Sequence, residues 1–295
     1  MSERLEFRSK SPFEIYHILS GLEALTEHSA YADLHIPEGE GPFGCVVAVH
    51  GSRGWANHHE DHIRNWLESG LAVCQLHPFS TRSVESVVED QLSVTYAMIL
   101  ADAFAVKHIL DSDDRIGAIG IAGWSLGGTV ATYSAWSPLI EALGTPFDAH
   151  LPFYPATHLR PDVKEWSDAP MLILHGTDDD WTPIGLVEGL LPELPNAILH
   201  TYSGAHHAFD STEEKRWMPK AIRLGKRTVK IEENGHMSGI WKFGIRFPMN
   251  ELRQRRLALR IIRNRGAHVM GTPVAREDAF QRGTSFLLTH LRHDS

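Results

Sequence analysis

The stretch Gly-Trp-Ser-Leu-Gly-Gly at residues 123–128 constrains this chain more than any other part of it. It follows an apolar run at residues 116–122, which is typical of a buried strand, and precedes a helical pattern at residues 129–136. A G-x-S-x-G motif between a strand and a helix is a nucleophile elbow, a sharp turn that exposes the serine hydroxyl on top of a sheet. The N-terminus of the following helix favours developing negative charge. The motif therefore predicts acyl transfer through an ester of Ser125.

A carboxylate and an imidazole follow this serine. Residues 171–174 form an apolar run that leads into three aspartates at 178–180, and residues 197–202 form another that leads into His206 and His207. A serine hydroxyl becomes a strong nucleophile when an imidazole takes its proton, and a carboxylate orients that imidazole. Ser, then Asp, then His, each after a strand, is the chain order of α/β-hydrolases. The residues alone leave open which aspartate and which histidine take part.

Strand and helix patterns alternate along the chain. The expected strands are residues 26–36, 43–50, 71–77, 116–122, 150–154, 171–174 and 197–202, and the expected helices include residues 60–69 and 87–110. This alternation predicts an α/β fold with a mostly parallel central sheet and helices on both faces. We expect the 295 residues to form a single domain. Ligands bind beyond the carboxyl ends of such strands, where the candidate residues fall.

These motifs resemble those of the dienelactone hydrolase family, which has the α/β-hydrolase fold. The similarity covers residues 30–210 and resumes at residues 273–291. It is carried by His-Gly-Ser-Arg-Gly at residues 50–54, the elbow, His-Gly-x-x-Asp-x-x-Thr-Pro and Gly-Ala-x-His-Ala-Phe. The resemblance implies a carboxylic ester hydrolase that acts on a small-molecule ester or lactone and needs no cofactor.

The same resemblance assigns the site residues. In the family's loop the acid lies three residues after the glycine and four before the proline, which selects Asp179. The base directly precedes Ala-Phe, which selects His207. The backbone N–H groups of Leu126 and Ser52 are the implied oxyanion hole.

The chain also departs from the family's founding members, which use a cysteine nucleophile and a glutamate in the oxyanion loop. Here Ser125 is the nucleophile and Gly51 occupies the glutamate position. Ser-His-Asp esterase chemistry is therefore expected instead of thiol chemistry. Gly-Trp-Ser-x-Gly-Gly is also similar to prolyl-oligopeptidase-type peptidases, so amide or peptide hydrolysis on the same triad is an alternative. A non-catalytic binding protein on the same fold is another.

Four residues are candidates for substrate binding. Arg82 follows a strand, roughly where the founding members hold a substrate carboxylate with an arginine, and a guanidinium fork suits that task. A structural arginine is the alternative. Arg53, Trp124 and Trp181 neighbour the oxyanion loop, the nucleophile and the acid in sequence and complete the expected set.

Composition limits the cellular context. No run approaches the ~20 apolar residues that span a bilayer, and the first eight residues are charged, unlike a signal peptide. Cys45 and Cys74 lie in strand-like runs, where we expect buried thiols in a reducing compartment. We therefore predict a cytoplasmic protein.

Residues 211–271 interrupt the family pattern. They hold 15 of the 28 lysines and arginines but only five acids, so they carry about +10 while the rest of the chain carries about −19. A basic amphipathic stretch at residues 252–265 can indicate nucleic acid or membrane binding. The acidity of the remaining chain argues against both partners. We expect a structured insert docked on its own acidic body, and its position after His207 suits a lid or the arm of a homodimer.

His58, His59 and His62 stand at helical spacing next to two acids. Such spacing is compatible with a metal site. The order of the residues differs from H-E-x-x-H, so we expect an exposed helix start and no metal.

Overall fold

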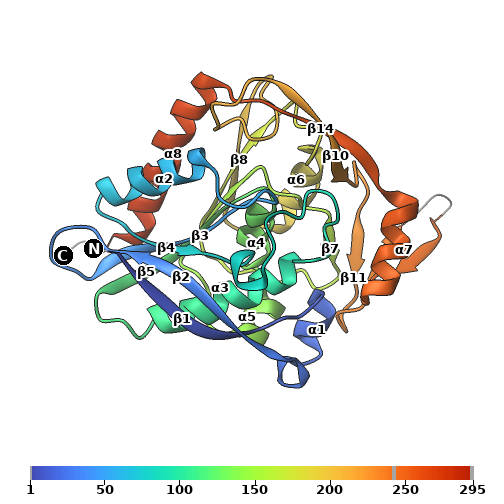
Figure 1. The fold of residues 1–295 in the computed structure, drawn as a ribbon, viewed down its shortest axis with the longest axis horizontal. Helices are drawn as coiled ribbons and strands as arrows, with labels where there is room; N and C mark the ends of the chain where they lie inside the picture. Colours follow the sequence, from blue (N-terminus) through green and yellow to red (C-terminus); the bar gives the residue numbers. More distant parts are fainter. Residues whose placement is uncertain (1, 241–243, 293–295) are drawn as a thin grey trace.

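The computed structural model describes residues 2–240 and 244–292, and a large sheet lies at its centre (Figure 1). Its strands are β1 (Ser2–Lys10), β2 (Glu27–His35), β3 (Phe43–Val49), β4 (Ala72–Leu76), β5 (Ile116–Trp124), β6 (Ala149–Phe153), β8 (Met171–Gly176) and β9 (Ala197–Tyr202). They run in the order β1-β2-β4-β3-β5-β6-β8-β9. The pairs β1–β2 and β2–β4 are antiparallel, and every pair from β4 to β9 is parallel. The predicted mostly parallel sheet is confirmed.

Helices cover both faces of this sheet, as predicted. The described helices are α1 (Ile15–Leu19), α2 (Asn57–Glu68), α3 (Tyr96–Leu110), α4 (Leu126–Tyr133), α5 (Ser137–Leu143), α6 (Gly185–Leu190), α7 (Leu252–Ile262) and α8 (Pro273–Leu291). Of these, α7 belongs to the insert and lies away from the sheet. Strand β3 shows why two layers are needed. Its residues Cys45, Val47 and Val49 pack into the core with α3 and α4, whereas Val46 and Ala48 pack into the core with α2 and α8. Figure 1 shows α2 and α8 on one side of the sheet and α3 and α5 on the other.

Strand β1 and helix α3 are two of the elements that differ from the predictions. Strand β1 was not expected, because its charged residues alternate with only a few buried ones along an edge strand. Helix α3 begins at Tyr96 instead of residue 87, with the Thr95 side chain accepting a hydrogen bond from the N–H of Met98. The nine residues before it form turns, and Gln91 has a positive φ of 55°. Apolar periodicity continued through these turns and concealed the helix start.

The insert at residues 211–271 folds onto the body. It contains β10 (Arg216–Arg223), β11 (Val229–Ile231), β12 (Met237–Ile240), β13 (Arg246–Pro248), α7 and β14 (Asn264–Val269). Strand β11 pairs in parallel with β7 (Leu159–Pro161) of the body, and β10 pairs with β14. Buried insert residues such as Ile231 and Met249 belong to the same core cluster as α3 and α4. The insert is therefore structured and packs against the body.

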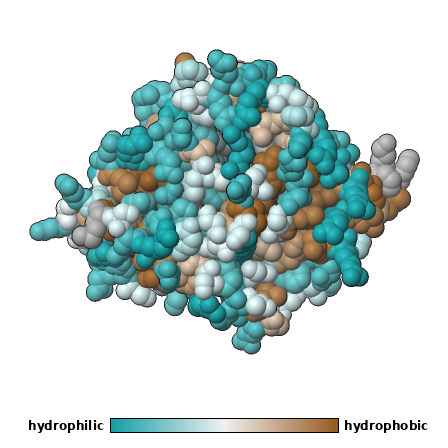
Figure 2. All heavy atoms as spheres, in the orientation of Figure 1, coloured by the Kyte–Doolittle hydropathy of each residue, from teal (hydrophilic) through white to brown (hydrophobic). Residues whose placement is uncertain are grey.

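Helix α7 of the insert lies at the periphery of the molecule (Figure 1). Among its exposed apolar side chains are Leu252, Leu257 and Ile261. Figure 2 shows apolar side chains gathered over this part of the surface.

Both cysteines are buried free thiols, as expected. Burial raises the pKa of Cys45 to about 12, so this thiol stays protonated and packs as a small apolar group. Among the described residues, no helix is both long and apolar enough to cross a bilayer.

Candidate active site

Ser125 lies at the sharp turn between β5 and α4. Its backbone has φ 54° and ψ −107°, a conformation that side-chain-bearing residues rarely adopt. Adding a Cβ to Gly123 would place it 2.3 Å from the carbonyl oxygen of Gly127, and a Cβ on Gly127 would lie 2.0 Å from that of Val49. These contacts explain why glycines flank the serine in the motif. The turn projects Ser125 beyond the carboxyl end of the sheet.

Three side chains form a hydrogen-bonded chain at this turn. The hydroxyl of Ser125 lies 2.9 Å from Nε2 of His207, and Nδ1 of His207 lies 2.7 Å from Oδ2 of Asp179. Because a carboxylate only accepts hydrogen bonds, Nδ1 carries the proton and Nε2 is free to accept the serine proton. All three residues are buried. This arrangement can deprotonate the serine hydroxyl as it attacks a carbonyl.

The carboxylate of Asp179 is held by several donors. Its Oδ1 accepts the N–H groups of Trp181 and Thr182, both at 2.8 Å, and its Oδ2 accepts the hydroxyl of Thr182 at 2.8 Å. Burial alone would raise the pKa of Asp179, but His207 and these donors outweigh it and lower the pKa below the usual value. Asp179 therefore stays ionised and able to orient His207. Thr182, which sequence reasoning did not single out, stands directly before the proline of the loop motif.

The neighbouring aspartates point elsewhere. Asp178 is exposed, and Asp180 binds the N–H of His268 at 2.8 Å and the ring of the same residue at 2.9 Å. His206, beside His207, contacts Nζ of Lys215 at 2.9 Å. Of the alternatives in the sequence, only Asp179 and His207 lie in line with Ser125.

This geometry predicts the order of effects in the aspartate loop. Asp179→Asn is expected to lower kcat/KM for a small ester by about 10³- to 10⁴-fold, because an amide no longer fixes the imidazole tautomer. Asp178→Asn is the matched control and should keep activity within about threefold, as expected for a surface substitution. Initial rates with purified variants test this order, and a larger loss in the Asp178 variant would reverse the assignment.

The expected oxyanion donors border the same space. The N–H of Leu126 is the first of helix α4, and first-turn N–H groups have no acceptor within their own helix. The loop at Ser52 is fixed from the other side, because its carbonyl accepts the N–H of Val87 at 2.9 Å and the hydroxyl of Ser86 at 3.1 Å. The side-chain amide of Gln91 donates a hydrogen bond to the hydroxyl of Ser52 at 3.3 Å. Leu126 and Ser52 both line the cavity beside Ser125.

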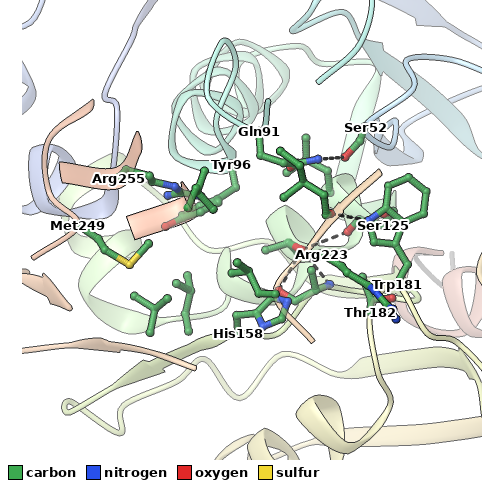
Figure 3. A pocket seen from close by; sticks show the side chains of 18 of the residues that line it. Ser52, Gln91, Tyr96, Ser125, His158, Trp181, Thr182, Arg223, Met249 and Arg255 are labelled. Atoms are coloured by element: carbon green, nitrogen blue, oxygen red, sulfur yellow. Dashed lines mark hydrogen bonds between the residues drawn. The ribbon is translucent and has the colours of Figure 1, made fainter. Parts of the chain in front are cut away.

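Two pockets meet at Ser125. When the space open to solvent is included, the large pocket has a volume of about 790 Å³ and the small pocket about 400 Å³. Both are bordered by Ser52, Ser125 and Trp181, whereas His207 borders only the small one. The large pocket has a mainly apolar lining, and the insert contributes Ile222, Arg223, Leu224, Val229, Met237, Met249, Arg255 and Leu259 (Figure 3). The insert therefore forms a wall of the space that faces Ser125.

Comparison with known proteins places this chain in a family. A family model described as the dienelactone hydrolase family matches residues 32–230. The chain belongs to the dienelactone hydrolase family. It has the α/β-hydrolase fold and, by this membership, is a carboxylic ester hydrolase.

Several solved structures are similar to this chain. A structure named m3DLH is 14% identical, with 99% of each chain covered and a TM-score of 0.59. Est1E from Butyrivibrio proteoclasticus with bound ferulic acid is 18% identical over 61% of this chain and 88% of its own, with a TM-score of 0.48. Esterase 2 from Thermogutta terrifontis is 17% identical over 61% of this chain and 78% of its own, with a TM-score of 0.49. No curated protein matches the chain significantly.

This member of the dienelactone hydrolase family has little space at Gly51, beside the nucleophile. A Cβ at Gly51 would lie 3.2 Å from the carbonyl oxygen of Trp124 and 3.5 Å from Cβ of Ser125. The oxyanion loop thus approaches the nucleophile through backbone atoms.

The structure corrects the prediction for Arg82. Its guanidinium binds the carboxylate of Asp102, with Nη1 at 2.5 Å and Nη2 at 3.1 Å from the two oxygens, and also the carbonyl of Pro78. Asp102 lies on α3 and is fully buried. Arg82 borders neither pocket, so it neutralises a buried carboxylate instead of facing a substrate.

The other three candidates border the pockets in different ways. Trp181 borders both pockets, with its ring centroid 4.8 Å from that of His207. Arg53 borders the small pocket, but its guanidinium is paired with Glu213 at 2.6 Å. The indole of Trp124 is fully buried beneath the small pocket and is unavailable for substrate contact.

The histidines at the start of α2 are buried, so the prediction of an exposed helix start is wrong. Asp210 accounts for the burial of His58 and His62. Its carboxylate accepts hydrogen bonds from His62 at 3.2 Å, the indole of Trp124 at 2.9 Å and the hydroxyl of Tyr154 at 2.8 Å, and His58 lies 4.0 Å away. Burial raises the pKa of Asp210, but these partners outweigh it and lower the pKa to about 2.

This network was missed because nothing in the sequence separates Asp210 from other acids. Within the described residues, no group of three or more histidines, cysteines or acids has the geometry to hold a metal ion.

Proposed function

We propose that this protein hydrolyses carboxylic esters of small organic molecules through an acyl-enzyme on Ser125. The observation that carries this proposal is the continuous chain of hydrogen bonds from Ser125 through His207 to Asp179. Ser125 attacks the ester carbonyl while Nε2 of His207 takes its proton. The N–H groups of Leu126 and Ser52 stabilise the oxyanion.

Collapse of this intermediate breaks the bond to the alcohol. His207 returns its proton to the leaving oxygen, and the acyl group remains on Ser125. Water then enters, gives a proton to His207 and attacks the acyl carbon, which releases the acid and restores the serine. Asp179 stabilises the imidazolium in both steps. No step requires a cofactor.

Labelling with a fluorophosphonate tests this proposal most directly. The probe forms a covalent bond with an activated serine, so mass spectrometry of the labelled protein should find it on the peptide that contains Ser125. A panel of aryl esters, lactones and aminoacyl anilides then ranks ester, lactone and amide cleavage. A protein that is not labelled and is inactive on the whole panel would be a binding protein on this fold.

We also propose that residues 224–263 of the insert act as a lid over the large pocket. Several side chains of this segment line the pocket, as described above. A lid excludes water and adds apolar contacts for a larger substrate.

A hairpin variant tests the lid. Arg223 of β10 pairs directly with Asn264 of β14, so an Asn-Gly turn can join them in place of residues 224–263. This retains the contacts of β14 with His207 and Asp180. The lid forms one wall of the pocket, so its removal should expose about two or three CH₂ groups of an octanoyl chain. At ~0.8 kcal/mol per buried CH₂, kcat/KM for the octanoyl ester should fall by about 10- to 100-fold relative to the acetyl ester.

The measurement is kcat/KM for both esters in the two proteins, with a melting curve to establish folding. Equal losses on the two esters would make the segment purely structural. A change from dimer to monomer without altered chain-length preference would instead support an arm between subunits.

A further inference from the structure

The two pockets at Ser125 differ in their access to the catalytic base. Nε2 of His207 must reach the leaving oxygen, so the alcohol part of an ester has to lie on the side of His207. His207 borders only the small pocket. If the proposed acyl-enzyme mechanism holds, on which this inference rests, the alcohol occupies the small pocket and the acyl chain extends into the large one.

The far end of the large pocket contains an ion pair. In Figure 3, Arg255 and Met249 lie at the end opposite Ser125, with Tyr96 beside Arg255. Arg255 on α7 pairs with Glu14, which is fully buried, and the hydroxyl of Tyr96 donates to the same carboxylate. The guanidinium also lies 5.4 Å from the centre of the Tyr96 ring. The rest of the pocket wall is mostly apolar but also includes Gln91, His158 and Arg223.

The guanidinium of Arg255 has more N–H donors than the carboxylate of Glu14 can accept. Arginine carries five N–H donors, whereas Glu14 shares its two oxygens between Arg255 and Tyr96. Within residues 2–240 and 244–292, Nε of Arg255 is a buried donor without a hydrogen-bond partner. Burial lowers the pKa of Arg255 to about 10, so the group is still charged at neutral pH. Buried donors without acceptors are costly, and a ligand oxygen would remove that cost.

The charge balance at this end favours a neutral oxygen. Glu14 already cancels the charge of Arg255, so a ligand carboxylate would add an uncompensated negative charge close to Glu14. In an apolar pocket such a charge is strongly unfavourable. A ketone, ether, amide or hydroxyl oxygen accepts the same hydrogen bond without that penalty.

We infer that Arg255 is a specificity-determining residue that selects esters whose acyl chain carries a neutral oxygen acceptor at its far end. The large pocket binds the apolar stem of the acyl chain, and the guanidinium of Arg255 donates a hydrogen bond to the oxygen at the end of that acyl chain. This assigns to Arg255, with opposite charge preference, the role that sequence reasoning gave to Arg82.

The wild-type protein provides the first test. The substrates are p-nitrophenyl esters of straight acyl chains from acetyl to dodecanoyl. From butanoyl upward, each has one matched analogue with a ketone on the penultimate carbon and another with a terminal carboxylate. At the chain length that reaches Arg255, the ketone ester should exceed the plain ester in kcat/KM by about 10- to 100-fold, the usual range for a hydrogen bond to a charged group. The carboxylate ester should fall below the ketone ester. No ketone preference at any length, or a preference for the carboxylate, would overturn the inference.

Three variants then connect the preference to the residue. Arg255→Met keeps most of the side-chain length and should bring the ratio of ketone to plain ester to within about threefold of one. Arg256→Met, the adjacent exposed arginine, is the matched control and should keep the wild-type ratio. Glu14→Gln removes the compensating charge and should shift selectivity toward the carboxylate ester by about tenfold or more.

A retained ketone preference in Arg255→Met would also reject the inference. The wild-type series needs no altered protein, so the inference stays testable even when a variant folds poorly. Hydrolysis of the acetyl ester and its loss in Ser125→Ala report on the proposed function separately. Failure of that control rejects the acyl-enzyme mechanism, whereas failure of the chain-end preference alone rejects only the role of Arg255.

Discussion

Replacing Ser125 by alanine is expected to lower kcat/KM for a small activated ester by about 10⁴-fold or more, while the protein remains folded. The substitution removes the nucleophilic oxygen, which lies 2.9 Å from Nε2 of His207, and leaves the other contacts of the turn in place. Steady-state kinetics and a circular dichroism spectrum measure the two parts of this prediction. Activity within tenfold of the wild type would mean that another group, or directly activated water, attacks the ester.

His207→Ala should cause a loss of similar size, since a serine without a base is a weak nucleophile. The double variant should be no worse than either single variant by more than about tenfold, because the two side chains act as one unit. His206→Ala is the matched control. It contacts Lys215 instead of the triad, and its activity should stay close to that of the wild type. An inactive His206→Ala variant together with an active His207→Ala variant would overturn the assignment of His207 as the base.

The central sheet and the triad could be predicted because local sequence encodes them. A buried parallel strand needs a continuous apolar run, and such runs coincide with β3, β5 and β8. The elbow requires glycines where a Cβ would collide with neighbouring backbone, so its spacing survives in the sequence. Ser125, Asp179 and His207 each follow a strand, and parallel strands bring their carboxyl ends to one edge.

Arg82 could not be predicted because its partner depends on packing. The side chain of Asp102 lies on α3, twenty residues away, and only the docking of that helix brings it to the guanidinium. The same limitation applies to Arg255, whose contact with Glu14 joins the insert to the segment before α1. Charge alone indicated a basic insert, but which arginine enters the pocket depends on how α7 packs.

The second prediction with a large expected effect is a loss of folding stability at acid pH. The free energy of unfolding is expected to fall steeply as the pH drops from about 6.5 toward 4, because three histidines, two of them buried and one partly buried, stay neutral in the folded protein. Burial lowers the pKa of His50, His150 and His158 to about 4. In each ring Nδ1–H donates to a backbone carbonyl at 2.7–2.9 Å. The unfolded chain, with a histidine pKa of ~6.5, binds protons in this window that the folded chain does not.

The sign and size follow from this difference. Where the unfolded state binds more protons, stability decreases as pH falls, and each histidine costs about 3 kcal/mol by pH 4. Together the three approach the whole stability of a typical domain, about 5–15 kcal/mol. Asp210 affects the free energy of unfolding at a lower pH than the histidines do. Its folded pKa of about 2 preserves stability above the unfolded value of ~3.9, and that contribution is lost only as pH falls further toward 2.

Urea unfolding between pH 7.5 and 4 measures this dependence. His150→Gln removes one titrating group whose contacts are structural, with Nδ1 bonded to the carbonyl of Ala131 and near the hydroxyl of Ser134. Between pH 4 and 6.5 this variant should lose stability less steeply than the wild type, by about 1.4 kcal/mol per pH unit, the value of one proton. His108→Gln is the matched control, since His108 is exposed, and it should leave the slope unchanged. A wild-type stability that stays flat down to pH 4 would show that these buried rings are protonated in the folded protein, in conflict with the single-donor pairing of each ring to its carbonyl.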